Sequence, residues 1–411
     1  MDDAVDADGI LLSALAPDSR DDPYTPLAAL RDAAPVHHHE PLDTRFLTRY
    51  ADCQAVLSGP SFAVPDREWL VRERPEWLDR PAADFFYASL LGTNGAAHDR
   101  LRRPLAGAFG RGRIAELSAD VERTADELLD RFADATSDGG AADFQALVGY
   151  PLPVAVVGGL IGVPRADQEQ FHRLGQDAAR LLEPVRSAAD WRRADAAVTA
   201  LREYFAALLR ERRARPAGDL ASTLLAEAAA ERAPVAEHEL ADLLLLLFVA
   251  GFETTAGLLG LTVFALLTHP DQAALLRTDP ALLPGAVEES LRWDGPVLMT
   301  ERLAVHTTEV AGVTVPAGGS VTTVLGAANR DPLRYPDPDA FLVRRPDVRV
   351  LSFGAGPHYC FGAALARLEA VALLGRLLAR FPGLRLAGPG VRRPSACLRS
   401  FDELPLATTG R

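Results

Sequence analysis

The sequence predicts a mainly α-helical protein of the α+β class, with a large helical body and a smaller β-rich region. Apolar residues recur at helical spacing over 121–134 and 200–213, and the segment 239–269 is apolar on nearly every face. The segment 312–325 instead alternates and contains the turn Pro316-Ala317-Gly318-Gly319, which predicts a β-hairpin. Helices followed by a compact strand region favour α+β over repeated βαβ units.

The elements are expected in the following order along the chain. Residues 1–35 read as a loose lead-in with one short helix, 46–50 as a strand, 51–57 as a helix and 59–97 as an irregular, aromatic-rich stretch. Residues 98–293 read as helical, 331–347 as a proline-rich meander, and a last helix runs from near Cys360 to Phe381. Since no repeat or long linker interrupts the chain, we expect a single domain over 1–411.

Composition narrows the class of protein. The 411 residues carry a formal net charge of −13, which disfavours a global role in nucleic-acid or membrane-surface binding. The three cysteines are far apart, so a disulfide framework is not expected and a reducing compartment fits best. The acidic N-terminus is unlike a signal peptide, and the apolar run 243–252 is too short to span a bilayer of about 30 Å. We therefore expect a cytoplasmic protein without a membrane anchor.

The strongest local signal is the loop Phe353-Gly354-Ala355-Gly356-Pro357-His358-Tyr359-Cys360-Phe361-Gly362. Two glycines and a proline shape a rigid turn, and the cysteine then precedes an apolar helix. The free N–H groups and dipole of a helix N-terminus stabilise a thiolate. Gly362 allows the backbone to pass close to a flat cofactor.

This spacing, F-G-x-G-x-H-x-C-x-G, resembles the haem-binding loop of the cytochrome P450 family, and the resemblance continues from about residue 45 to the C-terminus. It implies the P450 fold, with haem b held between the long central helix and the helix after the cysteine. Cys360 would be the iron ligand, and Phe353, Gly354, His358 and Gly362 would contact the cofactor.

The segment Ala250-Gly251-Phe252-Glu253-Thr254 resembles the oxygen-activation motif of that family. Polar groups in the middle of an apolar helix are costly unless they have partners or a use. The resemblance implies that Thr254 bonds the bound oxygen, Glu253 passes protons inward, and Gly251 leaves room for dioxygen. The alternative is that Thr254 bonds the carbonyl of Ala250 while Glu253 faces water.

Four cationic candidates resemble the residues that hold the haem propionates. His98 and Arg102 lie one helical turn apart, Arg302 follows in a predicted strand, and His358 lies in the cysteine loop. Charge-assisted bonds from such groups would anchor two carboxylates. The family usually has Pro-Pro before the first histidine, where this chain has 95–97 as Gly-Ala-Ala.

Glu289 and Arg292 resemble the family's E-x-x-R pair, which is structural and holds a third arginine from the meander. The sequence leaves that third residue open between Arg344 and Arg345, because Leu342-Val343 replaces the usual Asp-Pro.

The resemblance implies a monooxygenase that places one oxygen atom of O2 into a C–H or double bond of a mainly apolar small molecule, such as a secondary-metabolite intermediate. No flavin or nicotinamide fingerprint is present, so electrons would come from a ferredoxin or flavodoxin with its reductase. This donor would dock on a local basic patch, with Arg100, Arg103, Arg111, Arg113, Arg349 and Arg367 as candidates. Two alternatives remain: a peroxide-driven haem enzyme, or a haem-binding sensor or docking protein without turnover.

Overall fold

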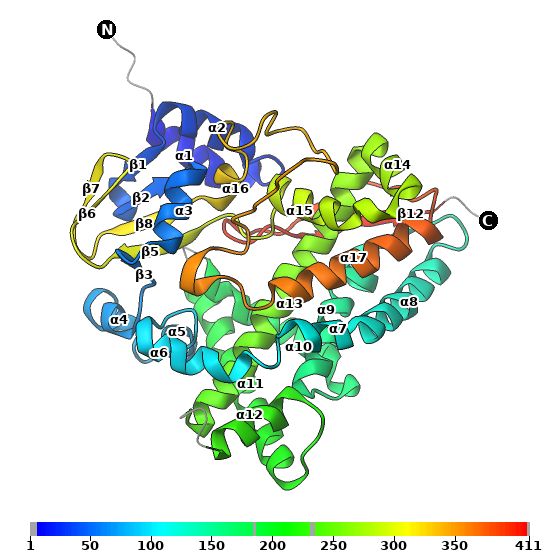
Figure 1. Ribbon diagram of the computed structural model, residues 1–411, viewed down its shortest axis with the longest axis horizontal. Helices are drawn as coiled ribbons and strands as arrows, with labels where there is room; N and C mark the ends of the chain where they lie inside the picture. Colours follow the sequence, from blue (N-terminus) through cyan, green and yellow to red (C-terminus); the bar gives the residue numbers. More distant parts are fainter. Residues whose placement is uncertain (1–5, 184–185, 231–234, 409–411) are drawn as a thin grey trace. The chain divides into compact units, whose positions relative to one another are not determined.

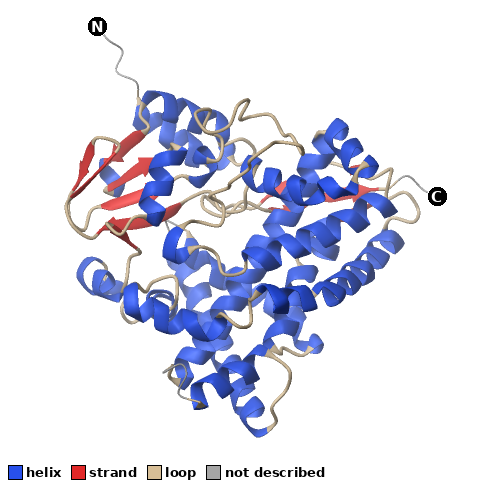
Figure 2. Ribbon diagram, in the orientation of Figure 1, coloured by secondary structure: helices blue, strands red, loops and turns tan. Residues whose placement is uncertain are grey.

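The computed structural model describes residues 6–183, 186–230 and 235–408. Figure 1 labels their helices and strands in chain order. The chain divides into two compact units. Of the described residues, unit 1 comprises 6–64, 257–360 and 378–408, and unit 2 comprises the rest, mainly the described part of 65–256 together with 361–377. Helices predominate, and the strands lie almost wholly in unit 1 (Figure 2). The mainly α, α+β class predicted from the sequence is confirmed.

The N-terminal residues are more ordered than the sequence suggested. Instead of a loose lead-in with one short helix, they form α1 (Ala7–Leu15) and α2 (Tyr24–Ala33), which pack on each other. Leu11, Leu27 and Leu30 are at most 1% exposed and belong to one apolar cluster of unit 1. Burial of these leucines, each worth about 2 kcal/mol, is what orders the segment.

The main sheet of unit 1 has the strand order β1-β2-β8-β5-β3. Strand β2 pairs with β8 in parallel, and the other neighbours are antiparallel. The strands are β1 (Val36–His39), β2 (Thr44–Leu47), β3 (Phe62–Ala63), β5 (Thr300–Ala304) and β8 (Ser320–Thr323). The expected strand at 46–50 therefore begins two residues earlier, and 50–58 form the helix α3 (Tyr50–Ser58).

The prediction that the two halves of 312–325 pair with each other as a hairpin is wrong. Strand β7 (Val313–Val315) instead pairs antiparallel with the preceding strand β6 (Thr308–Val310), and β8 joins the main sheet. The β6–β7 turn consists of Ala311 and Gly312, both at positive φ (51° and 79°). Two consecutive residues at positive φ form the tight turn whose twist matches that of a hairpin. The hairpin turn is therefore Ala311-Gly312 and not the expected turn at 316–319.

Unit 2 is helical almost throughout. The stretch 59–97, expected to be irregular, contains two short helices and the start of a third, because its aromatic residues pack inward: Phe85 and Tyr87 are buried. The helices are α4 (Arg67–Glu73), α5 (Pro81–Ala88), α6 (Gly95–Arg102), α7 (Arg111–Glu116), α8 (Ser118–Ala135), α9 (Pro151–Ile161), α10 (Gln168–Ala179), α11 (Ala188–Ala214) and α12 (Leu220–Ala229); the strand β4 (Ala141–Asp143) precedes a π-helical turn, Gln145–Gly149.

The predicted long apolar helix is α13 (Glu237–Thr268), which belongs to unit 2 up to Ala256 and to unit 1 from Gly257. It is long and apolar enough to cross a membrane, but 78% of its most apolar window is buried inside the protein. Burial on nearly all sides is the behaviour of a core helix and accounts for its uniform apolar composition.

The remaining elements follow the expected order. The meander 331–347 contains no helix or strand, and the last helix, α17, begins three residues after Cys360. The other elements are α14 (Pro270–Thr278), α15 (Leu283–Trp293), α16 (Leu325–Ala328), α17 (Ala363–Arg380), β9 (Arg385–Leu386), β10 (Val391–Arg392), β11 (Phe401–Glu403) and β12 (Pro405–Ala407). Antiparallel pairs join β10 to β11 and β9 to β12.

Candidate active site

The cysteine loop of unit 1 is closed by backbone hydrogen bonds. The N–H of Cys360 donates to the carbonyl of Phe353 at 2.8 Å, and the N–H of Tyr359 donates to the carbonyl of Gly356 at 3.0 Å. Cys360 is exposed and is not in a disulfide. The loop thus holds a thiol-bearing residue at the surface of a fixed turn, just before the N-terminus of an apolar helix.

Two glycines that precede the cysteine in the loop adopt the left-handed conformation, with φ of 68° at Gly354 and at Gly356. At Gly356 a side chain is also blocked, because a Cβ would lie 2.6 Å from the carbonyl oxygen of Leu57 at the end of α3. Only glycine meets both demands cheaply. The loop is therefore seated directly on the backbone of α3.

The other two cysteines, Cys53 and Cys397, are ordinary core residues. The thiol of Cys53 donates to the carbonyl of Leu47, and that of Cys397 donates to the carbonyl of Met299. Both are buried, and burial raises the pKa of the Cys53 thiol far above its usual range. Their environment contrasts with the exposed position of Cys360.

The motif at 250–254 is a short stretch where α13, which is buried over most of its length, exposes some of its residues. Ala250 is exposed, and Gly251 and Thr254 are half-buried, so residues on one helical face are accessible. The hydroxyl of Thr254 donates to the carbonyl of Ala250 at 2.9 Å, the bond typical of a helical threonine. Glu253 is only 2% exposed, so it does not face water as the structural alternative required.

Gly251 has a packing role that the sequence did not reveal. A Cβ at this position would lie 3.1 Å from a methyl carbon of Val157 in α9. The missing side chain therefore serves the contact between α13 and α9, in addition to any role beside dioxygen.

His98 and Arg102, two of the residues expected to contact the propionates, lie in α6 of unit 2. His98 is 2% exposed, and burial together with the neighbouring Arg102 lowers the pKa of its imidazole. The guanidinium of Arg102 lies 4.6 Å from the ring centre of Phe361, the residue that follows Cys360. Phe361 also meets Phe109 edge to face, at 4.9 Å between ring centres.

Arg302 in β5 is the clearest sign that unit 1 accommodates an anionic group. It is 6% exposed, yet in the described chain it forms no ion pair and donates to two neutral oxygens, the Thr300 hydroxyl and the Glu301 carbonyl. Burial lowers the pKa of its guanidinium to about 10. A buried cation without a carboxylate is costly, and an added carboxylate such as a propionate would satisfy it.

Comparison with known proteins decides which family this arrangement represents. The sequence pattern described as Cytochrome P450 matches residues 67–384, which contain α6, the α13 motif and the cysteine loop. The chain belongs to the cytochrome P450 family. The chain is also 35% identical to the cytochrome P450 monooxygenase PikC of Streptomyces venezuelae, over 96% of this chain and 93% of that protein. It is 35% identical to 6-deoxyerythronolide B hydroxylase of Saccharopolyspora erythraea, over 94% and 96% of the two chains.

Solved structures agree. The crystal structure of P450BioI with a hexadec-9Z-enoic acid ligated acyl carrier protein matches at a TM-score of 0.89 and 31% identity, covering 95% of this chain and all of that one. The crystal structure of CalO2 matches at 0.87 and 34% identity, covering 96% and 98%. This cytochrome P450 is accordingly a haem-thiolate monooxygenase that acts on small molecules and receives electrons from redox partners.

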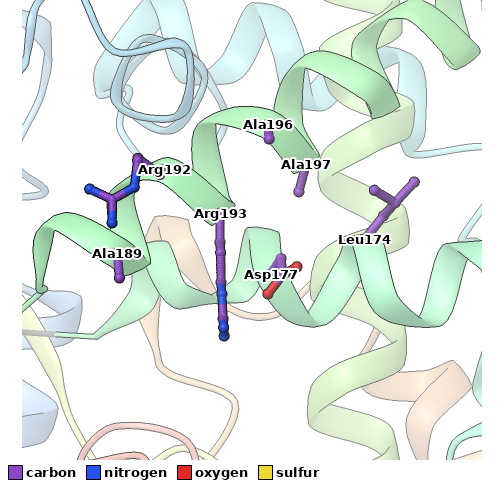
Figure 3. Close-up of a pocket in the computed structure, with 7 residues that line it drawn as sticks. All are labelled: Leu174, Asp177, Ala189, Arg192, Arg193, Ala196 and Ala197. Carbon is purple, nitrogen blue, oxygen red and sulfur yellow. The ribbon is translucent and has the colours of Figure 1, made fainter.

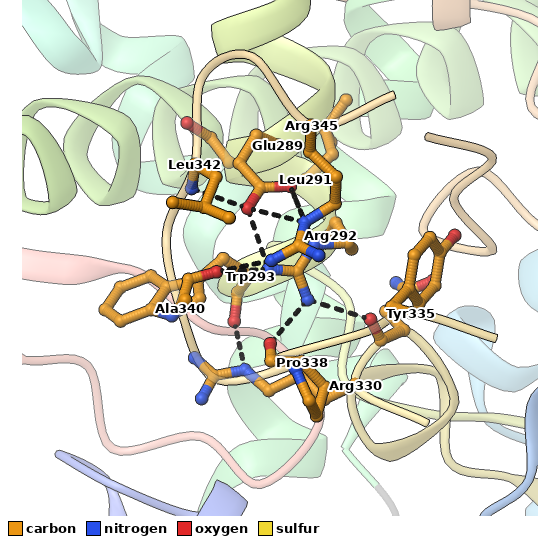
Figure 4. Close-up of polar contacts among 12 residues, drawn as sticks. Glu289, Leu291, Arg292, Trp293, Arg330, Tyr335, Pro338, Ala340, Leu342 and Arg345 are labelled. Carbon is orange, nitrogen blue, oxygen red and sulfur yellow. Dashed lines mark hydrogen bonds and ion pairs between the residues drawn. The ribbon is translucent and has the colours of Figure 1, made fainter. Parts of the chain in front are cut away.

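The structural triad of this P450 is complete within unit 1 (Figure 4). Arg292 and Glu289 are fully buried and form a double hydrogen bond at 2.7 and 2.8 Å. The third member is Arg345, whose Nε lies 3.1 Å from a carboxylate oxygen of Glu289. Arg344 is exposed, so the alternative that the sequence left open is resolved in favour of Arg345.

The structure leaves fewer candidate arginines for the basic patch on which the electron donor was expected to dock. Three of its candidates already have carboxylate partners: Arg100 with Glu239, Arg113 with Glu116, and Arg349 with Asp347. The side chain of Arg111 lies outside the described residues. Arg103 remains a candidate, because it is exposed and forms no ion pair among the described residues. Arg367, whose guanidinium donates to the carbonyl of Ala363, stays a prediction.

A separate hollow of about 410 Å³ lies between α10 and α11 in unit 2 (Figure 3). None of the residues predicted for the haem site lines it. Its walls are small apolar side chains and exposed arginines, with one acid: Leu174, Asp177, Ala189, Arg192, Arg193, Ala196 and Ala197. It is a surface groove and not the oxygen-activation site.

Sequence reasoning missed the residues that pack against the α13 motif. Gln145, Val157 and Gly175 all contact α13 residues between Gly251 and Ala256. The only sequence signal was a polar residue in an apolar stretch shortly before Gly149 and Pro151. That signal is too common to single out one glutamine.

Proposed function

We propose that Cys360 is the thiolate ligand of haem b in this monooxygenase. Haem, when bound, supplies dioxygen activation and the transfer of one oxygen atom to the substrate. The observation that carries the proposal is the cysteine loop, which presents Cys360 before the N-terminus of α17, where a thiolate is stabilised. Apart from Gly362 itself and its two chain neighbours, no atom of the described chain lies within 4 Å of a Cβ placed on Gly362. Protein packing therefore does not require this glycine, whereas the approach of a flat ring does.

Arg302, His98, Arg102 and His358 are proposed to hold the two propionates. Arg302 supports this role most directly, since it is buried and forms no ion pair in the described chain. His98 is also buried, and its lowered pKa would rise again beside an anion. These residues orient the cofactor and neutralise its charge, while Phe353 and Gly354 shape the loop beside the sulfur.

Glu253 and Thr254 are proposed to deliver protons. The Thr254 hydroxyl now donates to the carbonyl of Ala250 and can rotate to donate toward the accessible face of α13. Glu253 is the only carboxylate between Asp242 and Thr268 in the described helix, and its burial keeps bulk water away. Ala250 and Gly251 leave that face open.

The electron donor is proposed to be a ferredoxin or flavodoxin with its reductase, and the enzyme is proposed to act in the cytoplasm. Support for the donor class is the absence of a flavin or nicotinamide fingerprint from the sequence. The substrate is proposed to be a mainly apolar secondary-metabolite intermediate, like the substrate named for 6-deoxyerythronolide B hydroxylase. Because P450BioI was crystallised with a carrier-bound acyl chain, both free and carrier-bound substrates should be screened.

The deciding experiment is an absorption spectrum of the reduced protein with carbon monoxide. Thiolate-bound haem shifts the Soret band far to the red, and Cys360→Ser should abolish that shift, whereas Cys397→Ser should retain it. A spectrum typical of nitrogen-bound haem, or an unchanged spectrum in Cys360→Ser, would refute the assignment.

Turnover separates the proposed enzyme from its two alternatives. A ligand screened by its Soret shift is incubated with NADPH, spinach ferredoxin and ferredoxin reductase. Thr254→Ala should divert oxygen to hydrogen peroxide and lower the product formed per oxygen consumed. Equal product yield in Thr254→Ala would refute the role of Thr254 in proton delivery. No product from any ligand that shifts the Soret band would favour a sensor or docking protein, and full turnover with peroxide alone would favour the peroxide-driven enzyme.

A further inference from the structure

The α13 motif is held from three directions within unit 2. A Cβ on Gly251 would meet Val157 of α9 at 3.1 Å. The ring of Phe252 lies against Gly175 of α10, where a Cβ would come within 2.1 Å of it. Two residues after Thr254, the carbonyl of Ala256 accepts a hydrogen bond from the side-chain amide of Gln145 at 3.3 Å. The first two contacts are steric, and only the third is directional.

Gln145 is placed by an unusual local structure. It is fully buried and opens the π-helical turn Gln145–Gly149, whose closing bond runs from the N–H of Tyr150 to the carbonyl of Gln145 at 2.9 Å. Its amide folds back over that turn, so that a Cβ on Gly149 would lie 1.8 Å from its Oε1. Wide turns of this kind often accompany functional sites, and here the turn and its glycine together aim one amide at α13.

The bond to Ala256 is additional to the helix's own bonding. A carbonyl in a regular α-helix already accepts the N–H four residues later, and its second lone pair is free for a lateral donor. A buried lateral bond fixes the rotation of the helix about its axis more sharply than apolar contacts do, because hydrogen bonds weaken steeply with angle. The side chains whose direction depends on that rotation are Glu253 and Thr254.

We propose that Gln145 is a positioning residue for oxygen activation, fixing the backbone of α13 so that Thr254 and Glu253 face the reacting oxygen. The inference rests on the proposed roles of those two residues. It predicts that removing the amide, or displacing it, disturbs the surroundings of an iron-bound diatomic ligand without changing any residue that touches it.

The test uses carbon monoxide bound to the reduced holoenzyme and the infrared C–O stretch as readout, which needs no substrate. Gln145→Met removes the amide at similar volume, and Gly149→Ala keeps the amide but pushes it away. Each should broaden the C–O band or add a second band. Gln168→Met is the matched control, because Gln168 also donates to a carbonyl, that of Val163 at 3.5 Å, but not to α13.

Thr254→Ala separates the two levels of the argument. If it shifts the band while Gln145→Met and Gly149→Ala both keep the wild-type band, the positioning role of Gln145 is wrong and the proposed function stands. If Thr254→Ala itself leaves the band unchanged, the placement of Thr254 beside the ligand is wrong, and the role of Gln145 falls with it. A band change in Gln168→Met equal to that in Gln145→Met would also overturn the proposal, since any local destabilisation would then suffice.

Discussion

The network around Glu289 provides a sharp test of the structural reasoning, through replacement of Arg345 by methionine. Arg345 donates to the Glu289 carboxylate at 3.1 and 3.2 Å and to the carbonyls of Asp337 and Ala340 at 2.9 and 2.8 Å. Its side chain is 5% exposed. Removing one partner of a buried ion pair costs about 3–5 kcal/mol. Because Glu289 keeps the double bond from Arg292, we expect the lower end of that range, about 3 kcal/mol.

The neighbouring arginine supplies the control. Arg344 is exposed and forms no hydrogen bond or ion pair in the described chain, so Arg344→Met should change stability by less than about 0.5 kcal/mol. Both holoenzyme variants are unfolded in urea and followed by far-ultraviolet circular dichroism at one protein concentration. A loss below about 1 kcal/mol in Arg345→Met, or an equal loss in Arg344→Met, would refute the assignment of the third arginine.

Three further predictions concern the haem anchor, acid stability and the cysteine loop. Arg302→Met should speed haem transfer from the holoenzyme to apomyoglobin by roughly tenfold or more, because one charge-assisted bond to a propionate is lost; transfer at the wild-type rate would contradict this. Burial alone would raise the pKa of Asp294, but Arg399, Arg392 and the Tyr24 hydroxyl hold it well below its ordinary value of 3.8. The ionised Asp294 therefore contributes its full stabilisation above its ordinary pKa of 3.8, and this contribution is lost as the pH falls below 3.8 and through the lowered pKa of the folded protein. The urea midpoint of wild type should exceed that of Asp294→Asn by the full amount at about pH 7 and by a smaller amount at about pH 3. Gly356→Ala should lower the urea midpoint more than Gly354→Ala, because both have φ of 68° but only the former meets a carbonyl at 2.6 Å; equal losses would show that backbone strain alone matters.

The linear sequence was sufficient wherever function depends on adjacent residues. The cysteine loop, the α13 motif and the Glu289–Arg292 pair are each short segments whose spacing is set by one turn or one helix. Helical periodicity likewise predicted α8 and α13 closely, because a helix is stabilised by residues three and four apart, whereas it predicted only the C-terminal half of α11. The family and its chemistry follow from these local patterns.

Pairings between distant residues were decided by the tertiary structure. Strand β7 turned back onto β6 through Ala311-Gly312, and β8 paired with β2, more than 270 residues away along the chain. Arg345 was distinguished from Arg344 only by which side chain the meander turned inward toward Glu289. Gln145 reached Ala256 across 111 positions.

The sequence by itself therefore determined the family, the thiol-bearing loop and the helix that carries the acid and the alcohol. Only the tertiary structure decided that the buried Arg302 forms no ion pair among the described residues, which arginine completes the triad and which amide holds α13. The physical reason is that local spacing specifies backbone conformation, whereas burial and hydrogen-bond partners depend on long-range packing of the whole chain.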